Sequence, residues 1–197
     1  MAQSANNLRV RRTQKLLREA LIELIEERGF DALTVGEIAE RAMVSRAAFY
    51  RNYHDKYDLV EQIFAEAMQA LLNAVSEPET VHSPQIWVRF FDHIAEYERL
   101  YRALLGRKGS PWFVLKMRAS LVNLLKEFWH LAQGYPATLP IYPDSDEFVP
   151  NLVATMLVEA ITWWLEQGRP YPPQEIARRC VLLTSAIFKE TSTWQAV

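Results

Sequence analysis

A tightly punctuated segment near residue 35 constrains the fold of this chain most. Thr34 and Glu37 have the spacing of a capping box, in which each side chain satisfies a free backbone amide at the start of a helix. Leu33 and Ile38 occupy the two positions of a hydrophobic staple, which fixes how the chain enters that helix. The pattern predicts a helix of only two turns, ending at about Ala42.

A second short helix is predicted directly after this one. Ser45 is suited to cap a helix that ends near Asn52. Phe49 and Tyr53 are one turn apart and are expected to anchor this helix inward. Two short capped helices joined by a tight turn predict a helix-turn-helix unit.

Longer helices are predicted on both sides of this unit. Apolar residues recur at three- and four-residue steps between Thr13, a possible cap, and Gly29, a possible helix end. Asp55 is suited to cap a helix over residues 56–73. Beyond it, helices are expected at about 84–97, 98–105, 111–132, 148–167 and 173–190, with a proline-rich loop over 133–146. The prediction is an all-α fold of about nine helices.

This pattern predicts two domains. Residues 1–55 are expected to form a three-helix helix-turn-helix domain, linked by the helix at 56–73. Residues 56–197 are expected to form a helical domain for effector binding and dimerisation.

Composition argues against several other classes. No stretch reaches the ~18 apolar residues of a membrane span, so no membrane partner is expected. Residues 1–8 have no apolar core of a secretory signal. The single cysteine, Cys180, cannot form an internal disulfide, which is typical of the reducing cytoplasm. We also find no nucleophile elbow, phosphate loop or paired-cysteine zinc site, so neither an enzyme nor a cofactor or metal protein is expected.

Charge is unevenly distributed along the chain. Residues 1–60 have a net formal charge of +1, and residues 61–197 have −3. Residues 1–18 contain five basic and no acidic residues. Such clustering suggests a polyanion as partner, although a solvated basic tail would look the same.

The helix after Ser45 carries the functional hypothesis. A recognition helix reads base edges with its N-terminal residues, and small side chains there let the backbone lie deep in the major groove. Arg46 is the candidate for a bidentate contact with guanine. Ala47 and Ala48 are candidates for contacts with a thymine methyl group. Phosphate contacts, which position the protein without reading sequence, are expected from Tyr50, Lys56 and the amide or hydroxyl of Thr34.

Together these segments resemble the DNA-binding domain of TetR/AcrR-type transcriptional regulators. The resemblance covers about residues 10–65 and rests on residues 33–42, 44–53 and 55–59. It implies DNA contacts at Thr34, Arg46, Ala47, Ala48, Tyr50, Asn52 and Lys56, and Ser45 at the start of the helix joins this candidate site. It also implies a dimer whose C-terminal domain binds a small effector and changes the spacing of two DNA-binding heads.

Two positions depart from the family pattern. The turn residue before Val44 is commonly glycine in such proteins, but here it is Met43. Met43 must therefore adopt a left-handed conformation or the turn must be of another kind. The pair Ala47-Ala48 lacks the glycine or threonine often found there, so the operator of a relative cannot be assumed.

The last two helices are apolar on too many sides for a surface helix. Such a helix must be covered on both faces. We therefore expect a homodimer formed through residues 148–167 and 173–190, although a central core helix in a monomer would give the same pattern.

Aromatic and methionine residues are dense in the middle helices, as in a ligand cavity between helices. Plain core packing would produce the same stripe. The hypothesis is a pocket for an apolar or aromatic effector, with Trp87, Phe91, Leu104, Trp112, Phe113, Met117, Met156 and Trp163 as candidate lining residues.

The functional hypothesis is a ligand-responsive regulator, most simply a repressor, that binds a pseudo-palindromic DNA operator as a dimer. The alternative is an all-helical sensor or adaptor dimer that acts through protein contacts without sequence-specific DNA binding. The basic N-terminal segment and the intact Arg46, Tyr50 and Lys56 favour the regulator.

Overall fold

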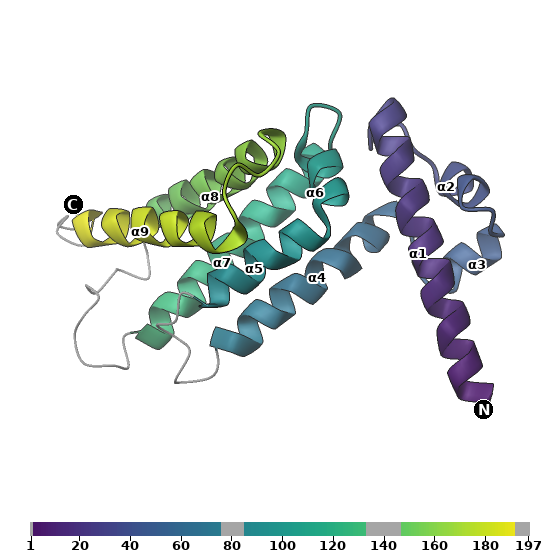
Figure 1. Cartoon of the computed structure of the whole chain (residues 1–197), viewed down its shortest axis with the longest axis horizontal. Coiled ribbons are helices and arrows are strands. Elements are labelled where there is room, and N and C mark those ends of the chain that lie inside the picture. The colour runs from purple at the N-terminus through teal and green to yellow at the C-terminus, as the bar shows by residue number, and fades with distance from the viewer. Residues whose placement is uncertain (1, 76–84, 133–146, 192–197) are drawn as a thin grey trace. The chain divides into compact units, whose positions relative to one another are not determined.

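The computed structural model describes residues 2–75, 85–132 and 147–191, and within these ranges the chain forms nine helices and no strand (Figure 1). The helices are α1 (Ala2–Arg28), α2 (Val35–Arg41), α3 (Arg46–Tyr50), α4 (Lys56–Val75), α5 (Gln85–Glu96), α6 (Glu98–Leu105), α7 (Pro111–Ala132), α8 (Phe148–Glu166) and α9 (Pro173–Thr191). The all-α prediction is confirmed, and the predicted ranges agree with these bounds to within about two residues at most ends. The expected loop over 133–146 lies outside the described residues.

Backbone contacts divide the chain into two compact units. The head unit comprises Met1–Glu66 together with Arg99–Ser110, and the C-terminal unit comprises Ala67–Glu98 together with Pro111–Val197. This division differs from the boundary expected at residue 55, because the first part of α4 and most of α6 belong to the head unit.

The start of α1 differs from the prediction. Thr13 was expected to cap this helix, but it lies well inside α1, which begins at Ala2. Residues 2–12 contain neither proline nor glycine, so nothing in the local sequence ends the helix before Thr13. Apolar residues from Leu17 to Ile25 provide the buried face of α1.

The predicted capping box at α2 is confirmed. The Thr34 hydroxyl accepts a hydrogen bond from the Glu37 amide at 3.3 Å, and the Glu37 carboxylate accepts from the Thr34 amide at 2.9 Å. Leu33 and Ile38, the expected staple pair, are both buried. These local bonds explain how a helix of seven residues holds its position.

The turn after α2 uses a left-handed residue that is not glycine. Met43 has φ of 54° and an exposed side chain. Its amide donates to the Glu40 carbonyl, and the Val44 amide donates to the Ala39 carbonyl, both at 2.9 Å. This is the bonding pattern of a Schellman motif, so the turn keeps the geometry that glycine usually provides.

Ion pairs hold α1 to its neighbours in the head unit. Arg41 of α2 forms two hydrogen bonds of 2.8 Å with the Glu27 carboxylate. Arg99 of α6 contacts Glu19 and Glu26 on the same helix. The acidic half of α1 is therefore neutralised from both α2 and α6.

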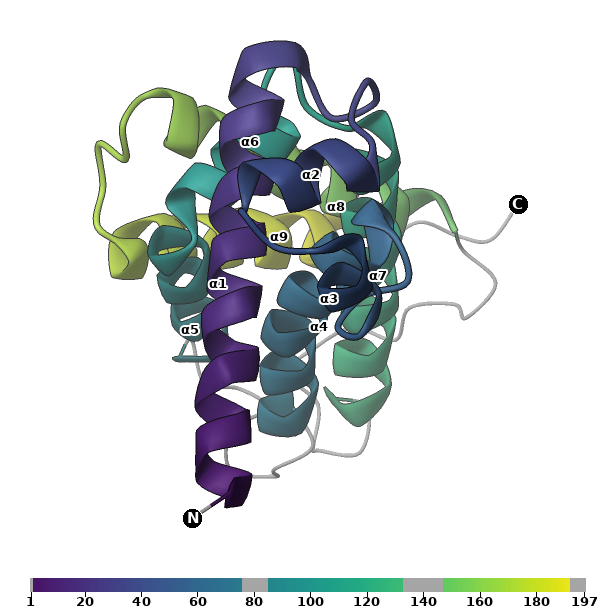
Figure 2. The ribbon, with the colours of Figure 1, turned by 90° about the vertical axis from the view of Figure 1, so that its right-hand side faces the viewer.

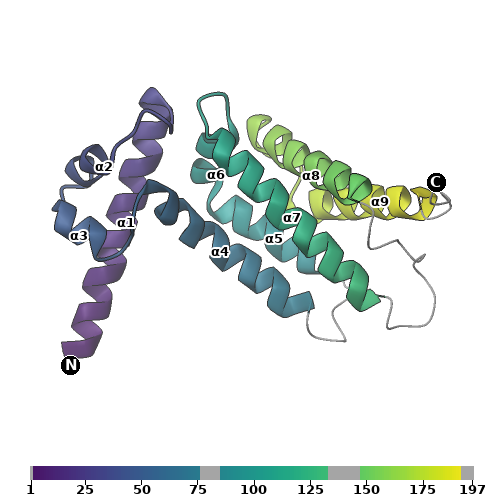
Figure 3. The same ribbon diagram turned by 180° about the vertical axis from the view of Figure 1, so that it is seen from behind.

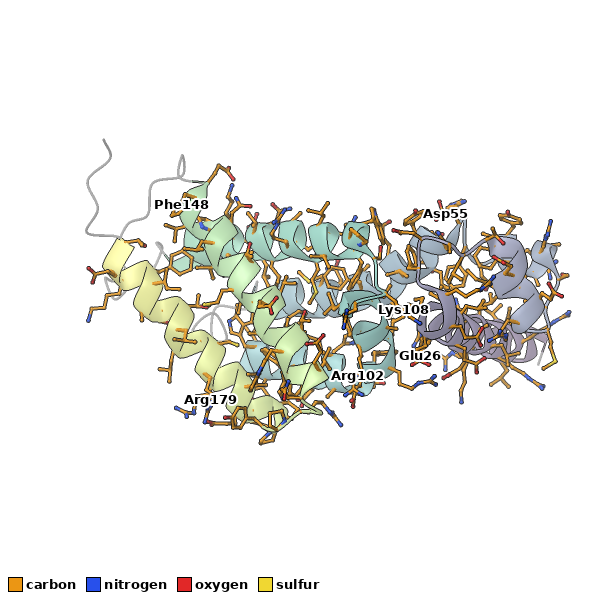
Figure 4. The ribbon with its side chains drawn as sticks, turned by 90° about the horizontal axis from the view of Figure 1, so that it is seen from above. Glu26, Asp55, Arg102, Lys108, Phe148 and Arg179 are labelled. Carbon is orange, nitrogen blue, oxygen red and sulfur yellow. The ribbon has the colours of Figure 1, made fainter. Side chains whose placement is uncertain are left out.

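The loop after α6 also caps the end of α1. The Lys108 amine donates to the carbonyls of Glu26 and Glu27 at 3.1 Å, and the Phe30 amide donates to the Lys108 carbonyl at 3.2 Å. Glu26 and Lys108 are labelled close together in Figure 4. A cation near the last carbonyls of a helix stabilises its C-terminal end.

The C-terminal unit is held mainly by apolar packing. Within it α8 contacts α7 and α9, and α9 also contacts α5 (Figure 3). Trp164 of α8 is fully buried, and its ring meets the edge of Phe91 with centroids 5.5 Å apart. Its indole N–H donates to the Tyr171 carbonyl at 2.8 Å, which joins the end of α8 to the turn before α9.

One described helix, α8, is long and apolar enough to cross a membrane by length and composition alone. The sequence prediction considered only stretches without a charged residue, and Glu159 interrupts such a stretch in α8. Half of its apolar window is buried inside the unit. Core packing therefore accounts for much of this apolar character.

Candidate DNA-binding site

The third helix is fixed from its N-cap and from its buried face. The Ser45 hydroxyl accepts a hydrogen bond from the Ala48 amide at 3.1 Å, as the sequence predicted. Phe49 and Tyr53 are buried, with ring centroids 5.7 Å apart. The predicted inward anchors are thus confirmed, and the rest of α3 is left to face solvent (Figure 2).

The exposed face of α3 presents the residues expected to meet base edges. Arg46 and Ala47 are exposed, Ala48 is half-buried, and Tyr50 is 58% exposed. No hydrogen bond or ion pair joins the Arg46 guanidinium to another residue in the part of the chain that the structure describes. Its donors are therefore available to a ligand.

Arg46 reaches back across the start of α2. A Cβ atom built on Gly36 would lie 2.5 Å from an Arg46 terminal nitrogen and 3.0 Å from its Cζ. The missing side chain of Gly36 thus leaves room for the guanidinium. Sequence spacing gives no sign of this role for Gly36, because the contact joins residues ten positions apart on two helices.

Two other candidate residues are already engaged in the fold. The Thr34 amide and hydroxyl both donate to the Glu37 carboxylate, at 2.9 and 2.8 Å. The Asn52 side-chain amide donates to the Ala48 carbonyl at 2.7 Å, at the C-terminal end of α3. In this conformation Thr34 positions α2 and Asn52 closes α3.

Lys56 is also engaged, and it is buried rather than presented to solvent. Its amine donates to the carbonyls of Phe30, Asp31 and Leu33 at 2.9, 3.0 and 2.9 Å. The amine also lies 4.7 Å from the centre of the Phe30 ring. Burial lowers the pKa of Lys56. All three amine hydrogens are used, so the expected phosphate contact is not available to Lys56 in this conformation.

Charges beside the capping box are strongly coupled. Hydrogen bonds from the Thr34 hydroxyl and amide, and then one from Arg28, lower the pKa of Glu37 to about 2. The Glu37 carboxylate is therefore ionised throughout the physiological range. Arg28 lies 2.8 Å from it and links the end of α1 to the start of α2.

The candidate effector residues fall into three groups. Trp87, Phe91, Phe113 and Met117 are buried in the C-terminal unit, where Trp112 and Met156 are half-buried. Leu104 is buried but belongs to the head unit. Trp163 is 43% exposed, so it does not lie in the interior as a pocket residue would. The sequence could not separate Trp163 from the buried Trp164 beside it.

The fold and this site define a helix-turn-helix DNA-binding protein with a second, all-helical unit. Residues 17–63 match the sequence model of "Bacterial regulatory proteins, tetR family". Residues 82–185, more than half of the chain, match "Transcriptional regulator C-terminal region" of the same family. The chain belongs to the TetR family of bacterial transcriptional regulators, which are DNA-binding proteins and not enzymes.

Two curated relatives from Bacillus subtilis strain 168 are similar to parts of the chain. The uncharacterised regulator YxbF is 36% identical over 70 residues, which cover 34% of this chain and 18% of YxbF. The uncharacterised regulator YdeS is 33% identical over 98 residues, which cover 50% of this chain and 45% of YdeS. The chain thus spans less than half the length of either relative.

Solved structures of similar fold match most of the chain. The dihydroxyacetone kinase operon activator DhaS superposes with a TM-score of 0.63 at 17% identity, covering 90% of this chain and 97% of its own. NalD of Pseudomonas aeruginosa, described as the secondary repressor of the MexAB-OprM multidrug efflux pump, gives 0.61 at 17% identity, covering 92% and 98%. At this level of identity the likeness establishes the fold.

Proposed function

We propose that this protein is a ligand-responsive repressor that binds a pseudo-palindromic operator as a homodimer. The observation that carries the proposal is the exposed face of α3, where Arg46 has free donors beside the small Ala47. A guanidinium with two free N–H groups is suited to the N7 and O6 acceptors of guanine in the major groove. Tyr50, which is exposed one turn further on, is suited to hold a phosphate.

The remaining candidates are assigned to positioning. Ser45 caps α3 and Asn52 closes it, whereas Thr34 and Lys56 hold the start of α2 through the bonds described above. Ala48 is expected to contact the groove wall or a thymine methyl group. In a dimer, two such helices would enter successive major grooves about one helical turn of DNA apart, roughly 34 Å.

The experiment is a selection from random duplex DNA followed by titration of the selected sequence. We expect a pseudo-palindrome that binds well above random DNA, with affinity that falls steeply as salt rises. Arg46→Ala should weaken operator binding by about 1–3 kcal/mol and relax specificity at one base pair.

Arg107→Ala is a matched control, since Arg107 is an exposed arginine of the head unit outside the helix-turn-helix. It should leave the selected sequence unchanged. If Arg46→Ala weakened operator and random DNA equally, the base contact would be wrong. No enrichment by a folded dimer would favour the adaptor function.

The dimer proposal rests on exposed apolar side chains of α8 and α9, which lie side by side in Figure 4. Phe148, Leu152 and Trp163 are 63%, 48% and 43% exposed and recur on one face of α8. Leu182 and Leu183 of α9 are each 56% exposed. A second copy covering both helices would remove these side chains from water and give an isologous four-helix interface.

Charge substitution tests this interface. Leu182→Lys together with Leu183→Lys should give a monomer in light scattering and abolish tight operator binding. Leu115→Lys is the control, because Leu115 is 54% exposed on α7, in the same unit. A dimer that survives the first change but not the second would place the interface elsewhere.

The effector proposal is restricted to the C-terminal unit. We propose that an apolar or aromatic compound binds among Trp87, Phe91, Trp112, Phe113, Met117 and Met156, and that it favours a spacing of the two heads that does not fit the operator. A panel of aromatic and aliphatic compounds would be screened by melting temperature and by release of operator DNA. If saturating concentrations changed neither, the proposal would fail.

A protein that acts on chromosomal DNA is expected in the cytoplasm, where its operator is found.

A further inference from the structure

The first half of α1 carries a group of cations that the proposed recognition site does not use. Arg9, Arg11, Arg12 and Lys15 are exposed side chains within seven residues. Residues 1–18 contain no acidic side chain that could neutralise them locally. We call these four residues the basic segment of α1.

The second half of the same helix carries acidic side chains whose charge is neutralised by neighbouring helices. Its carboxylates Glu19, Glu23, Glu26 and Glu27 are paired with Arg41 of α2 or Arg99 of α6. By contrast, no hydrogen bond or ion pair joins any side chain of the basic segment to another described residue. One helix thus has an acidic half neutralised within the fold and a basic half whose charge is left uncompensated.

Core packing does not account for the basic segment. All residues from Leu8 to Arg12 are exposed, and the first buried residue described in α1 is Leu17. Within the head unit these N-terminal turns of α1 extend past α2 and α3 (Figure 2). Four like charges held close together on a helix repel one another, so a ligand that neutralises them would gain from all four at once.

Duplex DNA matches this arrangement in charge density. The basic segment rises roughly 9 Å along the helix axis, and a duplex carries about five negative charges over that distance. A phosphate backbone beside the recognition helix would meet the segment without any base contact. Phosphate contacts of this kind supply affinity and orientation, not sequence information.

We propose that the basic segment of α1 binds DNA phosphates next to the base pairs read by α3, and so adds a sequence-independent anchor to each head. This inference rests on the proposed function, because it places the segment on the same duplex as Arg46. The four side chains contact the phosphates of the DNA backbone through their positive charge, without contacting bases. The anchor strengthens operator and random DNA binding alike.

The test is a variant in which all four residues are changed to Gln. Binding to the selected operator and to random duplex should each weaken by roughly tenfold or more at 0.15 M salt. The slope of log K against log salt should become less steep by about 2 to 4, since each lost phosphate contact contributes about 0.9. The sequence selected from random DNA should not change.

A matched control removes four positive charges from the C-terminal unit, outside the proposed dimer helices, by changing Arg89, Lys116, Arg118 and Lys126 to Gln. This control should change the slope of log K against log salt by less than about 0.9, the contribution of one phosphate contact. A second variant, with Arg9, Arg11 and Arg12 changed to Lys, should retain the native slope because phosphates bind either cation. Circular dichroism should show all variants to be folded, since the substituted side chains are exposed or half-buried.

The outcomes separate this inference from the proposed function. If the native protein selects no operator, the proposed function fails. If it selects one and the four-Gln variant keeps the native affinity and slope, only the anchor is wrong. A changed operator sequence, or a loss confined to the operator, would mean that the segment reads bases and would overturn the proposal. An equal loss in the control variant would overturn it as well.

Discussion

In the head unit, small helices are held in place by polar bonds, whereas in the C-terminal unit long helices are held by apolar packing. α2 and α3 have seven and five residues, and each depends on a side-chain cap. α8 has 19 residues and no side-chain cap at its start, but nine of its residues are buried. Position is therefore encoded locally in the head and through tertiary contacts in the second unit.

The largest effect is expected in the C-terminal unit, at adjacent tryptophans with opposite environments. Trp164→Ala should lower the free energy of unfolding by about 3–5 kcal/mol, because it removes a fully buried ring and its bond to the Tyr171 carbonyl. Trp163→Ala is the matched control and should cost less than about 1 kcal/mol in the protomer. Denaturant unfolding, at a protein concentration low enough that light scattering shows a monomer, measures both. Similar losses for the two would mean that Trp163 is also packed within the protomer.

The corresponding test in the head unit is Lys56→Met. This change leaves three carbonyls without their donor and should lower the free energy of unfolding by about 2 kcal/mol. If Lys56 only holds the loop between α1 and α2, the salt slope of DNA binding should stay as it is. A slope that becomes less steep by about 0.9 would show that the amine contacts a phosphate after all.

The comparison also explains what the sequence could predict. The caps at Thr34 and Ser45 are readable because both partners of each bond lie three residues apart. The role of Lys56 is not readable, because its acceptors are backbone carbonyls 23 to 26 residues away, and any residue type supplies a carbonyl. Gly36 escaped notice for a similar reason, since its partner Arg46 lies on another helix.

The positions of the apolar helices along the chain were predicted, but which of their side chains are buried was not. α8 is apolar on nearly every side, so periodicity gives no reason to place Trp164 inside and Trp163 outside. The same ambiguity affects the effector residues, since a packed core and a pocket draw on the same aromatic side chains. Near the N-terminus, Thr13 was wrongly predicted to be the N-cap of α1. A threonine marks the start of a helix only where the residues before it are not helical, and residues 2–12 are helical.

A smaller effect is expected at two of the turns that use a left-handed residue. Gly168, at the end of α8, has φ of 68° and open space around its missing Cβ. Gly168→Ala should therefore cost about 1 kcal/mol from backbone strain alone. Met43→Gly makes the opposite change at the end of α2 and should stabilise by about 0.5 kcal/mol, since relief of strain is partly offset by a more flexible unfolded chain. Loss of stability in Met43→Gly would show that the exposed methionine makes a contact worth more than the strain.

The smallest effect is expected from two carboxylates whose pKa is lowered to about 2, Glu37 in the head and Glu175 in α9. Because the folded pKa lies below the usual 4.5, each carboxylate stabilises the fold above pH 4.5. This stabilisation is lost as the pH falls from about 4.5 through about 2. Glu37→Gln should reduce the fall in melting temperature over that range, since glutamine keeps a capping acceptor but does not titrate.

Glu175→Gln is the matched change, but it should have less effect on the same measurement. Among the described residues Glu175 pairs with Arg178 and Arg179 of its own helix, whereas Glu37 joins the start of α2 to Arg28 of α1. Bonds within one turn survive in part whenever that turn forms in the unfolded chain, so little of their free energy counts toward folding. A contact between two helices is made only when the head is assembled. An equal pH response in the two variants would mean that the ion pair with Arg28 adds nothing to the local capping box.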